Sequence, residues 1–232
     1  NECVFKEESN TETTPPTEEQ SGENIEDINT TPPENIETIN NNPFIKGISF
    51  AKNEYYTNDE ISFTINSEDA DGDILTYLIG WFVNEKQLKQ YGATLSGEFF
   101  NKGDTITAKV VATDGKGYSN PVKAITIIKN SKPVITDLEF NQEKYFTYDY
   151  ININPISEDL DNDYIVHEYL WYVNDIKVNN DDEQVLIHDN FKAGDIVNVV
   201  VTAFDGEDYS EAIQSKDIVI LSAANNPYKI SE

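Results

Sequence analysis

From Pro43 onward, short runs of β-branched and aromatic residues alternate with clusters of Asn, Asp and Gly. The clearest run covers 104–113, where apolar residues occupy every second position: Ile106, Ala108, Val110 and Ala112. A period of two is typical of a strand with one face in a core and the other face in water. The pattern predicts an all-β sandwich, without helices.

The same pattern predicts six strands in the first half of this region. Their ranges are 44–51, 60–66, 74–84, 93–98, 104–113 and 121–129. Ile61, Phe63 and Ile65 supply the strand that faces 104–113. We expect Trp81 to lie across the centre of the core, where an indole buries on the order of 200 Å².

The chain is an internal duplication. The stretch 67–84 recurs as 157–174, so the two copies are 90 residues apart and Trp171 is the counterpart of Trp81. One residue is inserted after the tryptophans, and later pairs, from Gly103 and Gly194 to Ile127 and Ile218, are 91 apart. A period near 90 is too long for a solenoid repeat and fits two separately folded domains, expected at 43–130 and 131–222.

Residues 1–42 differ from the rest, because they carry eleven acidic residues against one lysine and repeat themselves at low complexity. This composition predicts a charged, extended spacer that cannot bury a core. The alternative is a segment that becomes ordered on assembly, by adding a strand to the sheet edge of a neighbouring subunit. Residues 223–232 are either a C-terminal tail or the start of a further strand.

The formal net charge of -27 argues against nucleic acid and anionic membrane surfaces as partners, and no apolar run is long enough to span a bilayer. The single cysteine, Cys3, excludes an internal disulfide and leaves a tether, an intermolecular disulfide or no role. The chain contains no methionine and begins with Asn1. We therefore expect a processed chain or a fragment, secreted or at the cell surface, whose signal segment has been removed.

Three motifs define each copy: an acidic Asp-Ala-Asp-Gly-Asp loop at 69–73, a Trp-Phe-Val-Asn strand end at 81–84, and an Ala-Thr-Asp-Gly end at 112–115. Together they resemble the PKD-like and cadherin-like immunoglobulin-fold modules of prokaryotic surface proteins, over residues 43–222. The Trp-Asp-Phe-Gly-Asp-Gly signature of typical PKD domains is missing, which favours the broader immunoglobulin-like label. The resemblance implies a spacer, an adhesin, a filament subunit or an appendage of a secreted enzyme.

The acidic loops predict calcium binding, because alternate aspartates deliver carboxylates to one side of a loop and a hard cation takes six to eight oxygens. Immunoglobulin topology would add one aspartate from the later Asp-Gly loop to each triad, at the end where the domain begins. The candidate ligands are Asp69, Asp71, Asp73 and Asp114 in the first copy, and Asp159, Asp161, Asp163 and Asp205 in the second. The alternative is a solvated acidic turn.

Catalysis is not expected, since no nucleophile motif or cofactor motif is present and no acid pair stands out from the other carboxylates. The two histidines occur only in the second copy. Asn29 lies in an N-glycosylation sequon, a motif that also occurs by chance.

The preferred hypothesis is a non-enzymatic extracellular structural or adhesive subunit, with itself, another surface protein or a glycan as partner. The alternative is a carbohydrate-binding or spacer fragment of a larger secreted enzyme, which an exposed row of aromatic residues would favour. An enzyme is the third hypothesis.

Overall fold

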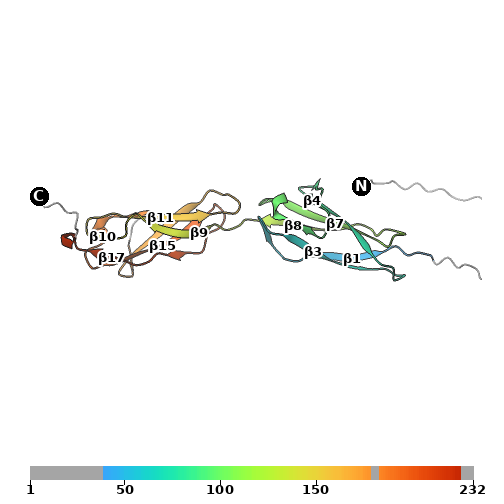
Figure 1. Cartoon of the computed structure of the whole chain (residues 1–232), viewed down its shortest axis with the longest axis horizontal. Coiled ribbons are helices and arrows are strands. Elements are labelled where there is room, and N and C mark those ends of the chain that lie inside the picture. The colour runs from blue at the N-terminus through green and yellow to red at the C-terminus, as the bar shows by residue number, and fades with distance from the viewer. Residues whose placement is uncertain (1–38, 179–182, 226–232) are drawn as a thin grey trace, which may run out of the picture. The chain divides into compact units, whose positions relative to one another are not determined.

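The computed structural model describes residues 39–178 and 183–225, and strands dominate this part of the chain (Figure 1). Within these ranges there is no α-helix, and the helical turns are three short 3₁₀ segments, η1 (Gly97–Phe99), η2 (His188–Asn190) and η3 (Ala223–Asn225). No helix in the described ranges is long and apolar enough to cross a lipid bilayer. The all-β class expected from the two-residue period is confirmed.

The first sandwich is made of two sheets. Its strands are β1 (Phe44–Phe50), β2 (Tyr55–Tyr56), β3 (Ile61–Glu68), β4 (Thr76–Val83), β5 (Lys86–Gln87), β6 (Thr94–Leu95), β7 (Thr105–Thr113) and β8 (Val122–Lys129). One sheet has the order β1-β3-β6 and the other the order β2-β8-β7-β4-β5. Neighbouring strands are antiparallel except for β2 and β8, which are parallel. Figure 1 shows β1 beside β3, with β4, β7 and β8 in the second layer.

The second sandwich repeats this arrangement. Its strands are β9 (Val134–Phe140), β10 (Tyr145–Phe146), β11 (Ile151–Glu158), β12 (Val166–Val173), β13 (Ile176–Lys177), β14 (Val185–Leu186), β15 (Ile196–Phe204), β16 (Ile213–Gln214) and β17 (Ile218–Leu221). The sheets have the orders β14-β11-β9 and β10-β17-β15-β12-β13, and β16 also pairs with β15. The fold is thus two tandem immunoglobulin-like sandwiches, and both lie within the single compact unit that begins at Asn40.

The predicted alternation places the core as expected. The inward residues of β7 (Ile106, Ala108, Val110 and Ala112) and those of β15 (Val197, Val199, Val201 and Ala203) are all 0% exposed. Ile61 and Phe63 of β3 are buried opposite them, as are Ile151 and Ile153 of β11. Apolar residues at every second position therefore build one core in each sandwich.

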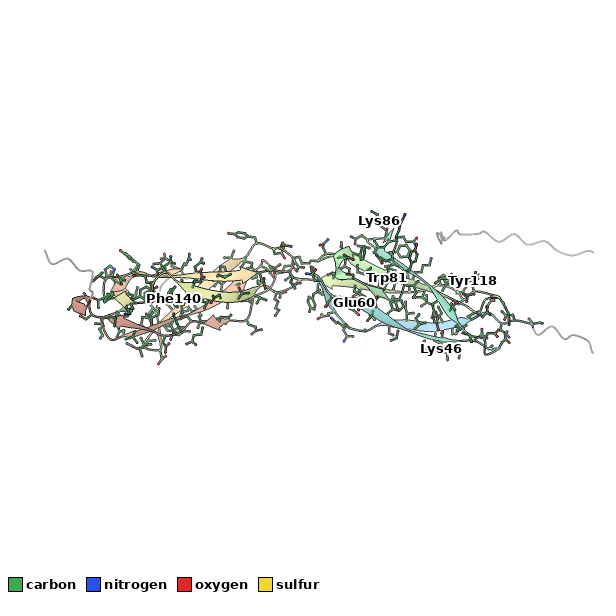
Figure 2. All side chains as sticks on the ribbon, in the orientation of Figure 1. Lys46, Glu60, Trp81, Lys86, Tyr118 and Phe140 are labelled. Carbon is green, nitrogen blue, oxygen red and sulfur yellow. The ribbon has the colours of Figure 1, made fainter. Side chains whose placement is uncertain are left out.

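The tryptophans lie at the centres of these cores. Trp81 is 0% exposed and Trp171 is 1% exposed, and Figure 2 shows Trp81 inside the first sandwich. The indole N–H of Trp81 donates to the carbonyl oxygen of Gly92 at 3.0 Å, and that of Trp171 donates to the carbonyl of Glu183 at 2.8 Å. A buried indole keeps its one donor satisfied in this way.

The strand predictions were wrong in three local respects. The two-residue strands β2 and β5 were not predicted, because two residues are too few to show a period. The expected strand at 93–98 is shortened to Thr94–Leu95, and the chain then turns into η1. Strands this short depend on their partners in the sheet rather than on their own sequence.

The pairing of Ile127 with Ile218 was also wrong by one residue. Ile128 and Ile220 are the true counterparts, since Gly103 N–H donates to the Ile128 carbonyl at 2.9 Å and Gly194 N–H donates to the Ile220 carbonyl at 2.8 Å. A second insertion near Ser215 interrupts the last strand and separates β16 from β17.

Candidate cation loops and the joint between the sandwiches

The acidic loops have the same local structure in both copies. Each follows a long strand, β3 or β11, and precedes β4 or β12. In the first loop the Oδ1 atom of Asp69 accepts the backbone N–H groups of Asp71 at 2.9 Å and Asp73 at 3.2 Å. In the second loop the Oδ1 of Asp159 accepts the N–H groups of the counterpart residues at 2.8 and 3.2 Å. One aspartate thus shapes each turn and the other two are presented by it.

These turns need a residue in the left-handed backbone region. Gly72 has a φ of 78° in the first loop, and its counterpart Asn162 has a φ of 62°. Glycine adopts this conformation without a steric penalty, and asparagine tolerates it better than most other residues. The change from Gly72 to Asn162 therefore preserves the loop.

Each aspartate triad has the geometry of a candidate cation site. The ligand oxygens of Asp69, Asp71 and Asp73 lie within 4.8 Å of one another, and so do those of the second triad, Asp159, Asp161 and Asp163. The Oδ2 atoms of Asp69 and Asp159 are buried and have no hydrogen-bond partner within the described ranges. A buried carboxylate oxygen without a donor is unfavourable, so these two atoms fit a cation ligand.

The aspartates of the later Asp-Gly loops are not part of the two clusters, and each one shapes its own turn. The Oδ1 of Asp114 accepts the N–H groups of Lys116 at 2.7 Å and Gly117 at 2.6 Å, and Asp205 accepts those of its two counterparts, each at 2.7 Å. The Asn40 side chain and the N–H groups of Gly117 and Lys116 lower the pKa of Asp114 from 3.8 to about 2. Asp205 is 8% exposed, and its pKa is also lowered, because donors outweigh the opposing effect of burial.

A short polar segment ties each pair of loops together. In the first sandwich the Asn40 side-chain N–H donates to Asp114 Oδ2 at 2.9 Å, and the Asn41 backbone N–H donates to Asp71 Oδ2 at 2.6 Å. A Cβ at Gly117 would lie 2.0 Å from the Asn42 side-chain oxygen, so the Asn42 side chain would have to turn away to make room for it.

The same two contacts recur at the second sandwich, and there they are made by the link between the sandwiches. The Asn130 side chain donates to Asp205 Oδ2 at 2.8 Å, and the Ser131 backbone N–H donates to Asp161 Oδ2 at 2.6 Å. The Oγ1 of Thr57 in the first sandwich also donates to Asp161. The acids of the second copy therefore hold the link and the preceding sandwich.

The lysines at the two triads come from different places. In the first copy Lys116, from the same sandwich, contacts Asp73 at 2.8 Å. In the second copy the position of Lys116 is occupied by Glu207, and Lys102 of the first sandwich takes over: its Nζ lies 2.5 Å from Asp163 and 2.9 Å from Glu207. Asp163 and then Glu207 raise the pKa of Lys102 well above its ordinary value, so this ammonium stays charged.

A groove of about 730 Å³ borders the joint. It is lined by charged and polar side chains together with two larger apolar groups, Tyr56 and Leu160. The joint is therefore held by directed polar contacts at least as much as by apolar burial.

The structure brings each predicted aspartate triad together, whereas the two other predicted ligands, Asp114 and Asp205, are not members of the two clusters. Each predicted triad forms a cluster, Asp114 is linked to the first triad through the Asn40–Asn41 segment, and Asp205 is linked to the second through Asn130–Ser131. Sequence reasoning missed Lys102 and the bridging asparagines. Aligning the copies could have found Asn40 and Asn130, which are 90 residues apart. Asn29, Cys3 and the tail lie outside the described residues.

No protein-family model and no curated protein matches the sequence. Solved structures similar to this chain include a two fibronectin type-III domain segment from chicken tenascin, with 12% identity over 75% of this chain and 98% of that one and a TM-score of 0.42. The fibronectin(III)-like modules of Clostridium thermocellum CbhA show 14% identity over 80% of this chain and 100% of theirs, with a TM-score of 0.30. The chicken CNTN1 FN1-FN3 domains show 15% identity over 78% of this chain and 68% of theirs, with a TM-score of 0.32. The immunoglobulin-like assignment rests on the strand pairing of the chain itself.

Proposed function

We propose that this chain is a non-enzymatic structural or adhesive subunit outside the cell, such as a filament, stalk or adhesin module of the PKD-like or cadherin-like kind. The observation that carries the proposal is the joint. Thr57, Lys102 and Asn130 of the first sandwich and its link all contact acidic loops of the second. Charge-assisted hydrogen bonds are directional, so a joint built from them favours a defined orientation of the two domains. A rigid stalk or a filament subunit requires this property.

The loop acids serve structure in this proposal rather than catalysis. A glycosidase-like mechanism needs two carboxyl groups beside a substrate cleft, one of them in an apolar pocket that raises its pKa. Here the resolved shifts of aspartate pKa are downward, because the carboxylates accept N–H donors or contact lysines. Such groups remain ionised and suit binding and bridging.

Calcium is the cofactor proposed for the triads. Asp69, Asp71 and Asp73 would hold one ion with help from Asp114, and the second site would use their counterparts Asp159, Asp161, Asp163 and Asp205. A bound divalent ion would supply positive charge that holds these carboxylates together. Within the first copy, the Lys116 ammonium already contacts Asp73, so a calcium ion would have to share this carboxylate with the ammonium or displace it. The residual negative charge of each cluster and the unpartnered Oδ2 atoms support the proposal.

A spin-label distance measurement tests the defined joint. Labels are attached to cysteines introduced at Tyr91 and Ile176, which are 67% and 72% exposed, in a chain whose Cys3 is replaced by serine. The expected result is one narrow distance distribution. A distribution as broad as that of two domains on a flexible tether would contradict the structural role.

Cellular location is tested separately. Antibody labelling of intact source cells should detect the chain, and protease treatment of those cells should remove the label. A chain that becomes accessible only after lysis would contradict an extracellular subunit.

The second candidate is a carbohydrate-binding or spacer fragment of a secreted enzyme. Tyr148 and Tyr150 favour it, because they are 42% and 55% exposed and lie near each other in sequence on the second sandwich. A glycan array tests this role. Binding that is lost with serine at both positions would support it.

A further inference from the structure

The duplication provides each sandwich with the same two surfaces. The donor surface is the one that Thr57 and Lys102 form on the first sandwich, and the acceptor surface is the one that Asp161, Asp163 and Glu207 form on the second. Inside the chain this donor meets this acceptor. The counterpart donor surface on the second sandwich and the counterpart acceptor surface on the first are not used by the joint.

The unused surfaces differ from the joined ones by a paired change of charge. On the donor side, the counterpart of Lys102 is Ala193, so the second sandwich lacks the bridging lysine. On the acceptor side, the counterpart of Glu207 is Lys116, which already contacts Asp73 at 2.8 Å. An acceptor that carries its own lysine does not need one from its partner. The two unused surfaces therefore match each other as the two joined surfaces do.

The second sandwich carries aromatic rings near its unused donor surface, at positions where the first sandwich has small or polar residues. Tyr148 and Tyr150 replace Asn58 and Glu60 of the first sandwich, and His188 replaces Gly97. The ring of Tyr148 stacks on Phe146 at 6.5 Å between centroids, and Tyr150 meets the edge of His188 at 5.7 Å. Exposed tyrosines are enriched in protein interfaces and contribute much of their binding energy.

This difference follows from a rebuilt turn. In the first sandwich a Cβ on Gly97 would lie 2.5 Å from the Cα of Asn58, which is left-handed with a φ of 68°. His188 brings a side chain to that position, and Tyr148, the counterpart of Asn58, is not left-handed. The substitutions therefore act as a set that changes what this surface presents.

The unused acceptor surface offers apolar groups beside its acids. Ile74 directly follows the Asp69–Asp73 loop and is 88% exposed, and Tyr118 directly follows Gly117 and is 62% exposed. Figure 2 labels Tyr118 and Glu60 at opposite ends of the first sandwich, so its acceptor and donor surfaces are separate.

We propose that the donor surface of the second sandwich binds the acceptor surface of the first sandwich in another copy of this chain. The proposal deepens the structural role proposed above and names a second copy as the partner. The contact joins two different surfaces, so it is heterologous, and every bound pair leaves one donor surface and one acceptor surface free, as in an open filament. Charge is consistent with it, because residues 43–130 carry nine lysines against eleven acidic residues, whereas 131–222 carry five against twenty. An acidic second sandwich is therefore repelled less by the nearly neutral first sandwich of another copy than by another second sandwich.

Sedimentation velocity of the full chain tests this contact over a concentration series from about 10 μM to about 1 mM, the range of weak interfaces. The expected result is a continuous growth of the mean mass past the dimer. Serine at both Tyr148 and Tyr150 should weaken association by about tenfold or more, equivalent to about 1.4 kcal/mol of binding free energy. Tyr91→Ser, on another exposed tyrosine, is the matched control and should have no effect.

A charge exchange tests the pairing itself. Lys116→Glu should weaken association, because it turns the acceptor of the first sandwich into the type that needs a donor lysine. Adding Ala193→Lys to that variant should restore association by recreating the charges of the internal joint. Lys86→Glu, the same charge change on β5, is the control and should leave association unchanged (Figure 2). Thermal melts of every variant show that each one is folded.

Several results would overturn the proposal. These are a monomer over the whole series, growth that stops at a closed dimer, and a Lys116→Glu defect that Ala193→Lys does not repair. A monomer that binds a neutral glycan through Tyr148 would assign the aromatic surface to sugar instead. A chain that is monomeric in solution but detected on intact cells would contradict self-association without contradicting the structural role proposed above.

Discussion

Replacing Trp81 with alanine should remove the largest side chain from the core of the first sandwich. The indole is 0% exposed, its ring centroid lies 5.3 Å from that of Phe63, and its strand partner on β7 is the small residue Ala108. Its N–H also satisfies the Gly92 carbonyl at 3.0 Å. The change therefore creates a cavity and leaves one carbonyl without its donor.

The expected loss is about 3–5 kcal/mol in the free energy of unfolding of the first sandwich, the range for truncating a large buried aromatic residue. A domain of this size is stable by only about 5–15 kcal/mol, so the first sandwich would be close to unfolding. Trp81→Phe keeps much of the apolar contact but removes the donor to Gly92. It should lose less, about 1–3 kcal/mol, which separates the hydrogen bond from the cavity.

Urea unfolding followed by tryptophan fluorescence and by circular dichroism measures the effect. Each sandwich contains one tryptophan, so in the Trp81 variants the fluorescence reports Trp171 and hence the second sandwich. We expect the first transition to move to lower urea while the Trp171 signal changes little. A loss below about 1 kcal/mol would show that Trp81 is not a core residue, since large core truncations cost more. An equal loss in both sandwiches would refute independent cores.

Three further predictions concern the loops. Lys102→Met should destabilise the second sandwich by about 1 kcal/mol and broaden the distribution of spin-label distances. Lys116→Met is the control and should leave the joint unchanged. Equal distance distributions in the two variants would contradict a joint held by ion pairs. Calcium at a hundredfold excess over its Kd should add about 2.7 kcal/mol to the free energy of unfolding of each sandwich. Asparagine at both Asp161 and Asp163 should abolish this gain in the second sandwich. If titration calorimetry gives no heat and chelation leaves the melting curves unchanged, the triads are solvated turns. The pKa of Asp114 is about 2 in the folded chain against 3.8 ordinarily, so its stabilisation is present above about pH 4 and is lost as the pH falls toward 2. Thermal melts over that range should show a smaller decline in Asp114→Asn, and an identical decline would refute this linkage.

The sequence by itself determined the fold class, the two cores and the shape of the acidic loops. The apolar residues at every second position, Ile106, Ala108, Val110 and Ala112, indicate which face of β7 is buried, because successive side chains along a strand point to opposite faces of the sheet. The loop at Asp69 is equally local, since its carboxylate bonds to N–H groups two and four residues later. Features set by neighbours in the chain are visible without a structure.

Only the tertiary structure decided which polar groups meet at the joint. Lys102 reaches Asp163 across 61 positions and Glu207 across 105, and nothing in the sequence around Lys102 marks it as different from other exposed lysines. The insertion near Ser215 and the short strands β2 and β5 were hidden for a related reason, because a strand of two residues exists only through its partner. Hydrophobic periodicity shows whether a residue faces a core, because it depends only on the local strand geometry. The partner of a surface charge depends on how the two folded sandwiches pack against each other, and the sequence around the charge does not contain this information.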